Sequence, residues 1–212
     1  MTPFSVACLH KVEAPGSVHV RLPVLRPNPL SEFDARVREL VERHDVTAAV
    51  ELLLEVHGPD LFGLLAGVLE DGSGARATYR AVAKRVAEEL ASFQWNWSAK
   101  IWLYSLAHRE LHGRRAQTTG LRVERELDTE VWRNAGLSAV IKAVRRTLTE
   151  EERELLILRV DRKLDWHSLA ATRLGGAASP SAIEGEARLL RARMKGLFDR
   201  VERLTEQHLQ QR

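Results

Sequence analysis

Aromatic and positively charged side chains are concentrated in one stretch of the chain, from Phe93 to Arg115. Three of the five tryptophans lie within eight residues of one another, at Trp95, Trp97 and Trp102. Cations and histidines follow directly, at His108, Arg109, His112, Arg114 and Arg115. Unpaired bases stack on aromatic rings while Lys and Arg contact the phosphates. The stretch therefore indicates a surface for single-stranded nucleic acid.

The alternative interpretation places these tryptophans in a hydrophobic core. Ser98 can cap a helix, and the apolar residues after it broadly follow helical spacing, at Ile101, Trp102, Leu106 and Leu111. Trp95 and Trp97 precede that helix and lie two residues apart, so they cannot both face inward on one helical stripe. We therefore expect at least one of them to face outward.

Two histidines of this stretch, His108 and His112, lie four residues apart, a spacing compatible with a metal ion. No Glu-then-His frame in the zinc-protease order surrounds them, and histidines beside phosphate contacts are the simpler interpretation. Paired carboxylates such as Glu88-Glu89 fall on expected helix surfaces, and the sequence has no Gly-rich phosphate loop. We expect a protein that works by binding, with no catalytic residue, no cofactor and no metal.

Length and composition place the chain among proteins that can bury a hydrophobic core without disulfide bonds or structural metal ions. It has 212 residues and a formal net charge of +3, with Lys and Arg clustered near 109–125 and 188–203. That distribution fits a phosphate-bearing partner. Cys8 is the only cysteine, which leaves no disulfide framework. We expect no apolar run long enough to span a bilayer and find no secretion signal in residues 1–11, which predicts a cytoplasmic protein without membrane contact.

Turn residues and apolar spacing predict an all-α chain with two small helical domains joined by a linker. The expected segments are an extended Pro-rich tail, a helical domain, a linker with a short helix and a second helical domain, at residues 1–30, 31–115, 116–146 and 147–208. In the first domain, Ser31 with Asp34 predicts a helix start. Further helices are expected at Thr47–Val56, Asp60–Leu69 and Ala75–Ala91, the first two separated by Gly58-Pro59.

The second domain has the pattern of a helix-turn-helix. Thr149 with Glu152 forms a capping box, and Asp165 can cap a second short helix. Residues 175–178 turn the chain, and Ser179 with Pro180 starts a third helix. Small helical bundles in general offer the same pattern.

The long C-terminal helix carries a strict seven-residue apolar repeat, at Ile183, Ala187, Leu190, Met194, Leu197, Val201 and Leu204. The repeat stops at His208. Roughly three heptads are the lower limit for a coiled-coil prediction. The helix either packs against its own domain or pairs with another helix, which makes a homodimer through this helix a candidate.

Two parts of the chain, in order, resemble the bacterial sigma factors of the extracytoplasmic-function group. Residues 93–109, FQWNWSAKIWLYSLAHR, are similar to the family's aromatic, serine and basic segment with its Trp-Leu-Tyr run. Residues 148–159, LTEEERELLILR, then 165–175, DWHSLAATRLG, and 190–193, LRAR, are similar to the family's carboxy-terminal domain. The resemblance covers roughly residues 32–115 and 147–205.

The resemblance implies a protein that binds core RNA polymerase and directs it to promoter DNA, with an anti-sigma protein as a further candidate partner. The first domain would capture and open the minus-ten element, and the second would read the minus-thirty-five element. The minus-ten residues carried over are Trp95, Trp97, Ser98, Lys100, Trp102, Arg109, His112, Arg114 and Arg115. The minus-thirty-five residues are Ser179, Ser181, Glu184, Arg188 and Arg191.

The chain departs from the family pattern, and a basic docking helix and an acidic recognition helix favour an alternative function, whereas the aromatic and basic stretch favours the first. The stretch that should dock on polymerase, residues 75–80, is basic where the family is acidic, and the docking residues carried over are Tyr79, Arg80, Lys84 and Arg85. Arg109 stands where the family has Asn, and Glu184 and Glu186 replace customary cations. The alternative is a sigma-like helical protein-interaction or regulatory module that uses its heptad helix and does not act on promoters.

Overall fold

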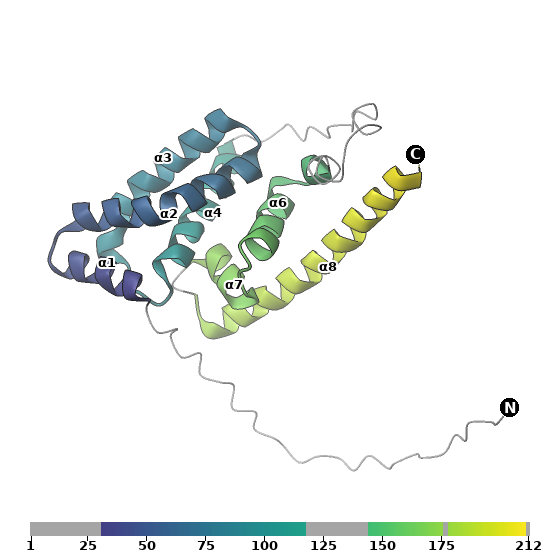
Figure 1. The fold of residues 1–212 in the computed structure, drawn as a ribbon. Coiled ribbons are helices and arrows are strands. Elements are labelled where there is room, and N and C mark those ends of the chain that lie inside the picture. Colours follow the sequence, from purple (N-terminus) through teal and green to yellow (C-terminus); the bar gives the residue numbers. More distant parts are fainter. Residues whose placement is uncertain (1–30, 118–143, 176–177, 211–212) are drawn as a thin grey trace, which may run out of the picture.

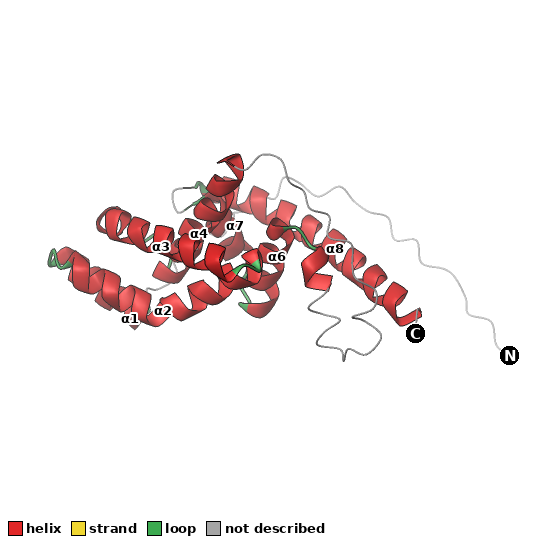
Figure 2. Cartoon of the chain, turned by 90° about the horizontal axis from the view of Figure 1, so that it is seen from above, coloured by secondary structure: helices red, strands yellow, loops and turns green. Residues whose placement is uncertain are grey.

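The computed structural model describes residues 31–117, 144–175 and 178–210, with the backbone alone at 114–117 and 204–210. Helices make up nearly all of these ranges, and no strand occurs in them (Figure 2). The expected all-α class is therefore confirmed. The Pro-rich tail with Cys8, and residues 118–143 of the expected linker, lie outside the described residues.

The first helix, α1 (Glu32–Glu42), begins at the expected cap. The Ser31 hydroxyl accepts a hydrogen bond from the Asp34 amide at 3.1 Å and donates one to the Asp34 carboxylate at 2.9 Å. Asp34 is buried, although an acidic side chain in a first helical turn is normally exposed. Its carboxylate also accepts a hydrogen bond from the start of helix α4 (Ala99–Gln117), as described below.

Helix α2 (Val46–Leu69) is continuous where the sequence predicts two helices, so that expectation was wrong. Pro59 lies inside α2, where it removes one backbone donor. Packing on both sides of Pro59 outweighs this loss, because Leu53 and Leu61 are fully buried in the same core. Gly58 faces the Tyr79 ring so closely that a Cβ atom would lie 2.6 Å from the Tyr79 hydroxyl oxygen. Tertiary contact therefore overrides the local helix-breaking signal.

By length and composition α2 is able to cross a membrane, with a mean hydropathy of 1.5. The expectation that no apolar run reaches this length was therefore wrong. Core helices of soluble proteins pass the same test, and α2 packs against α1, α3 (Gly72–Glu89) and α4 (Ala99–Gln117). One third of its apolar window is buried, so these neighbours account for part of the apolarity of α2.

The next elements complete the first half of the molecule. Helix α3 (Gly72–Glu89) starts at Asp71, whose carboxylate accepts the amides of Ser73 and Gly74 at 3.0 and 2.8 Å. A short 3-10 turn, η1 (Leu90–Ser92), leads into an irregular segment and then into α4 (Ala99–Gln117). Helices α2 and α4 both lie against α3.

The second half follows the predicted caps. Helix α6 (Glu150–Leu156) has the full capping box of Thr149 and Glu152 and continues as a π-helical turn, η2 (Ile157–Asp161). Helix α7 (Trp166–Leu174) is capped by Asp165 and ends at Gly175, which has a φ of 80°. Helix α8 (Pro180–Gln210) starts after Ser179, whose hydroxyl accepts the Ala182 amide at 3.3 Å. These local predictions are confirmed.

The buried side chains of the two halves join in one hydrophobic cluster. Helix α7 lies against α4, and α6 lies against α2, with α8 along the outer side of α6 and α7 (Figure 1). Only segments 31–117 and 144–210, with the gap at 176–177, enter this description. The division into two domains stays a prediction.

The heptad stripe of α8 faces the chain's own core. Its buried members are Ile183, Ala187, Leu190, Met194 and Leu197, and Val201 is partly buried. The side chain of Leu204 is outside the description. Over these residues the stripe packs within its own chain, so it is not exposed to a second helix.

Candidate nucleic-acid interface

The start of α4 is held by a residue far away in the sequence. The Asp34 carboxylate on α1 accepts the Ala99 amide at 2.9 Å, in a buried hydrogen bond. The Ser98 hydroxyl accepts the Ile101 amide at 3.4 Å, which agrees with the predicted cap. Free amides at a helix start need such acceptors. Asp34 thereby fixes the position at which the tryptophan segment enters α4.

Trp95 and Trp97 lie just before α4 and are both partly buried, whereas the residues that precede each of them, Gln94 and Asn96, are exposed. Trp95 has a φ of 57°, in the left-handed region. A bulky residue there is an outlier that costs about 1–3 kcal/mol. Its ring lies 4.7 Å from the Phe93 ring, centroid to centroid. The expectation that at least one of these tryptophans faces outward is met in part, since each keeps some exposed surface.

Trp102 is a core residue in this arrangement. Its exposed fraction is 7%, and its ring stacks on Phe93 at 4.7 Å with an angle of 20° between the planes. The apolar stripe of α4 carries it inward together with Leu103 and Leu106. Trp102 therefore cannot meet a base here, and the base-stacking role expected for it needs correction.

The cations of α4 that were expected to contact phosphates are paired with carboxylates. Lys100 Nζ lies 2.9 Å from Asp60, and Arg109 lies 2.6 Å from Glu89. His112 contacts Glu154, as described below. The side chains of Arg114 and Arg115 are outside the description. The described part of α4 thus offers little unpaired positive charge to a phosphate backbone.

Asp60 joins three elements. One carboxylate oxygen lies 2.5 Å from Arg162 Nη1, and the other accepts the Tyr104 hydroxyl at 2.5 Å and contacts Lys100. Partial burial alone would raise the pKa of Asp60, but the hydrogen bonds from Tyr104 and Lys100 and the charge of Arg162 lower it below its usual value. Burial and the Asp60 contact raise the pKa of Tyr104. Asp60 therefore links α2 and α4 to residues that follow η2.

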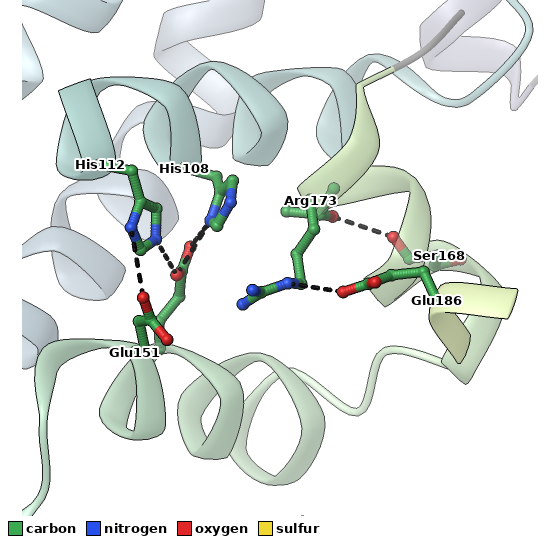
Figure 3. A network of polar contacts seen from close by, with 8 residues as sticks. His108, His112, Glu151, Ser168, Arg173 and Glu186 are labelled. Carbon is green, nitrogen blue, oxygen red and sulfur yellow. Dashed lines mark hydrogen bonds and ion pairs between the residues drawn. The ribbon is translucent and has the colours of Figure 1, made fainter. Parts of the chain in front are cut away.

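A second polar cluster lies between α4 and α6 (Figure 3). His108 Nδ1 lies 2.9 and 3.0 Å from the two Glu154 oxygens, and His112 Nε2 lies 3.2 Å from one of them. Glu154 is only 2% exposed. Burial would raise the pKa of Glu154, yet the hydrogen bonds and positive charge of the two imidazoles lower it to about 2. Glu154 is therefore ionised at neutral pH.

Further contacts join the two halves beside these clusters. Arg153 lies 2.6 Å from Glu70, the residue that ends α2. At two glycines of α2 the second half comes very close. A Cβ atom would lie 2.8 Å from Ile157 Cδ1 at Gly67 and 3.0 Å from an Arg162 nitrogen at Gly63. A larger side chain at either position would require the side chain of Ile157 or Arg162 to move.

The predicted minus-thirty-five residues lie at the start of α8. Ser179 and Ser181 are exposed, with their hydroxyl oxygens 3.1 Å apart, and Arg188 and Arg191 are exposed. Glu184 is held by His167 of α7 at 2.9 Å, and this hydrogen bond lowers the pKa of Glu184.

A parallel contact of 2.9 Å joins Glu186 to Arg173 of α7. Glu184 and Glu186 thus fasten α7 to α8, and Figure 3 shows the contact of Glu186 with Arg173.

The predicted polymerase-binding residues lie along α3. Tyr79 packs edge-on against Phe62 at 6.0 Å and is partly buried, whereas Arg80 is exposed. Lys84 lies 3.7 Å from Glu88, and Arg85 contacts both Glu89 and Glu110. The exposed part of α3 is thus a mixed-charge surface.

Sequence reasoning missed the carboxylates that position the candidate site. Asp34, Asp60 and Glu154 each act on α4 from a distant part of the chain. Asp34 and Glu154 are buried and Asp60 is partly buried, and nothing in the sequence indicates these environments. Comparison with protein-family models, curated proteins and solved structures finds no match to this chain.

Proposed function

We propose that the chain is a promoter-recognition subunit of bacterial RNA polymerase of the sigma type. The observation that carries the proposal is the conformation of Trp95, a partly buried aromatic residue in a strained backbone state beside Trp97. Backbone strain of this kind concentrates at functional sites. The ordered resemblance of residues 93–109 and 148–193 to the sigma family supports the same function.

In this mechanism Trp95 and Trp97 stack on bases of the opened minus-ten element. Base–aromatic stacking contributes about 1–3 kcal/mol per base and does not require a particular base. Helices α7 and α8 act as the helix-turn-helix, with exposed Ser181 and Arg188 near the start of α8 directed at the major groove of the minus-thirty-five element. The two halves act as separate domains.

Engagement of both elements requires the two halves to separate. Elements roughly 25 base pairs apart lie about 85 Å apart at about 3.4 Å per base pair. Helix α8, the longest described helix, is about 45 Å long at about 1.5 Å per residue. No described helix spans that distance, so the proposal includes separation of the two halves. Lys100 and Arg162 both contact the Asp60 carboxylate in the packed chain, and separation moves the positive charge of Arg162 away from Lys100.

The test combines the full chain with purified core RNA polymerase in size-exclusion chromatography, followed by a promoter-opening assay. We expect co-elution of the wild-type chain, and loss of opening but not of co-elution in Trp95→Ala/Trp97→Ala. Val56→Ala removes an exposed apolar residue elsewhere in the same half and serves as the control. Absence of co-elution contradicts the proposed function, and a folded double variant that opens promoters normally contradicts the role of the tryptophans.

One observation favours the second candidate, a sigma-like protein-interaction module. The described cations of α4 are paired with carboxylates, Lys100 with Asp60 and Arg109 with Glu89, so this helix presents little free positive charge to DNA. Leu189 and Phe198 are 59% and 49% exposed on different sides of α8, and each is a separate apolar position at which contact with a protein partner can be tested. If Leu189→Ala/Phe198→Ala abolishes binding to a partner while the wild-type chain fails to bind polymerase, this candidate replaces the first.

A further inference from the structure

Three potential metal ligands converge between α4 and α6. His108 and His112 lie one helical turn apart on α4, with ring centroids 4.1 Å apart, and Glu154 approaches from α6. One ligand atom from each lies within 4.8 Å of the other two. The side chains of His108 and Glu154 are nearly buried, and that of His112 is 25% exposed. The cluster therefore has a closed side in the core and an open side toward solvent.

The distances match those around a small four-coordinate ion. Ligand atoms at about 2.1 Å from a tetrahedral metal lie about 3.4 Å from one another. The imidazole nitrogens lie 2.9 to 3.2 Å from the Glu154 oxygens. Metal binding would need only a small outward movement of three side chains, whose ligand atoms already lie within 4.8 Å of one another.

The donor set selects the class of metal. Two imidazole nitrogens and one carboxylate oxygen suit zinc and neighbouring first-row transition ions, whereas magnesium and calcium prefer oxygen alone. The nitrogen of His112 that points away from Glu154 faces a Glu151 oxygen at 3.8 Å. A carboxylate behind a ligating histidine is the usual way in which proteins orient such a ligand. Glu151 is placed to do so here.

We propose that His108, His112 and Glu154 bind one divalent transition-metal ion of the zinc type, with Glu151 orienting His112. Because the ligands come from α4 and α6, the ion fastens the two halves of the chain together. Binding to the folded chain alone then stabilises it. The inference does not depend on the proposed promoter function. It also departs from the sequence-based expectation, since the third ligand comes 42 residues after His112.

The test is a titration of Zn²⁺ into the full chain after removal of bound metal, followed by calorimetry or equilibrium dialysis. We expect one ion per chain, bound at least tenfold more weakly by His112→Gln and by Glu154→Gln. The control is His167→Gln, the same substitution at a lone His–Glu pair with a 2.9 Å contact. That variant should bind Zn²⁺ as the wild type does.

A second readout covers the case in which the buried Glu154→Gln variant does not fold. His112 is partly exposed, so His112→Gln should fold, and Zn²⁺ should raise the melting temperature of the wild type but not of this variant. Absence of saturable binding to the wild type overturns the proposal and leaves a hydrogen-bonded triad. Binding that persists in both ligand variants overturns it as well, because the ion then sits elsewhere.

Discussion

Replacing Asp60 by Asn tests the contact that joins α2, α4 and the residues after η2. The substitution keeps the shape of the side chain and removes its charge. Three contacts of the Asp60 carboxylate weaken: those with Arg162 at 2.5 Å, with Tyr104 at 2.5 Å and with Lys100 at 2.9 Å. Asn can still accept one hydrogen bond through its carbonyl oxygen. The loss is therefore that of a charge, without a cavity.

The magnitude follows from the exposure of each partner. Hydrogen bonds to charged groups contribute about 1.5–3 kcal/mol when screened from water. The side chains of Asp60 and Arg162 are 23% and 27% exposed, and that of Lys100 is 39% exposed. We assign about 1 kcal/mol each to the Arg162 and Tyr104 contacts and nothing to the Lys100 pair, because solvent screens exposed pairs. Asp60→Asn should thus lower the free energy of unfolding by about 2 kcal/mol.

Thermal and urea unfolding, followed by circular dichroism and tryptophan fluorescence, measure this change. For a chain of this size about 2 kcal/mol corresponds to a fall of about 4–8 °C in Tm. Asp161→Asn is the matched control. Asp161 pairs with Arg145 at 3.0 Å, but the two side chains are 35% and 36% exposed, so solvent screens this pair more strongly. The control should lose less than about 1 kcal/mol.

Two results would refute the reasoning. One is a loss in Asp60→Asn no larger than in the Asp161 control. The other is strict additivity of Asp60→Asn with Arg162→Met, because residues in direct contact should show a coupling of about 0.5–3 kcal/mol. Either result would mean that the 2.5 Å contact does not stabilise the chain in solution.

Three further predictions concern individual positions. The pKa of Asp60 in the folded chain is below its ordinary value of 3.8. The stability that the ionised Asp60 contributes is therefore present above that pH and is lost as the pH falls toward the folded pKa. In acid-unfolding curves the stability difference between wild type and Asp60→Asn should shrink between about pH 5 and pH 2. Gly58→Ala should destabilise by about 1–2 kcal/mol by contact with the Tyr79 hydroxyl, and in a Tyr79→Phe background the penalty should vanish, as urea unfolding of the four variants would show. Thr149→Ala should cost about 1 kcal/mol through loss of the hydrogen bond from the Glu152 amide, whereas Thr149→Ser should cost much less; equal losses in thermal melts would argue against the capping box.

The helix starts were predictable because a cap and its partner lie within three residues. Ser31, Thr149, Asp165 and Ser179 were all identified as caps from the sequence and accept the expected amides. The α2 break at Gly58-Pro59 was predicted wrongly for a related reason. Local rules register the missing donor of Pro59 but not the core that forms on both sides of it.

The state of the candidate site was not predictable, because it depends on pairs distant in the sequence. Arg109 was expected to contact phosphate on the basis of its own neighbourhood, and it pairs with Glu89 on α3. Trp97 and Trp102 lie in similar sequence surroundings, yet Trp102 is buried and Trp97 is partly exposed. The reason is that the helix begins only at Ala99, so its periodicity places Trp102 but not Trp97. The start of α4 is in turn fixed by Asp34, which the sequence marks only as part of the cap of α1.

A larger side chain at Gly63 or Gly67 would favour the separated state proposed above without any change at the residues proposed to contact DNA or polymerase. A methyl group at Gly67 would lie 2.8 Å from Ile157 Cδ1, so either the Ile157 side chain rotates or α2 and η2 move apart to admit it. Overpacking costs about 1–3 kcal/mol. Since each 1.4 kcal/mol changes an equilibrium by about tenfold, one methyl group could raise the separated fraction by about one to two orders of magnitude. In the proposed mechanism, the smallest side chains at the contact would thus set the balance between the packed and the separated chain, and variation at these two positions would shift it.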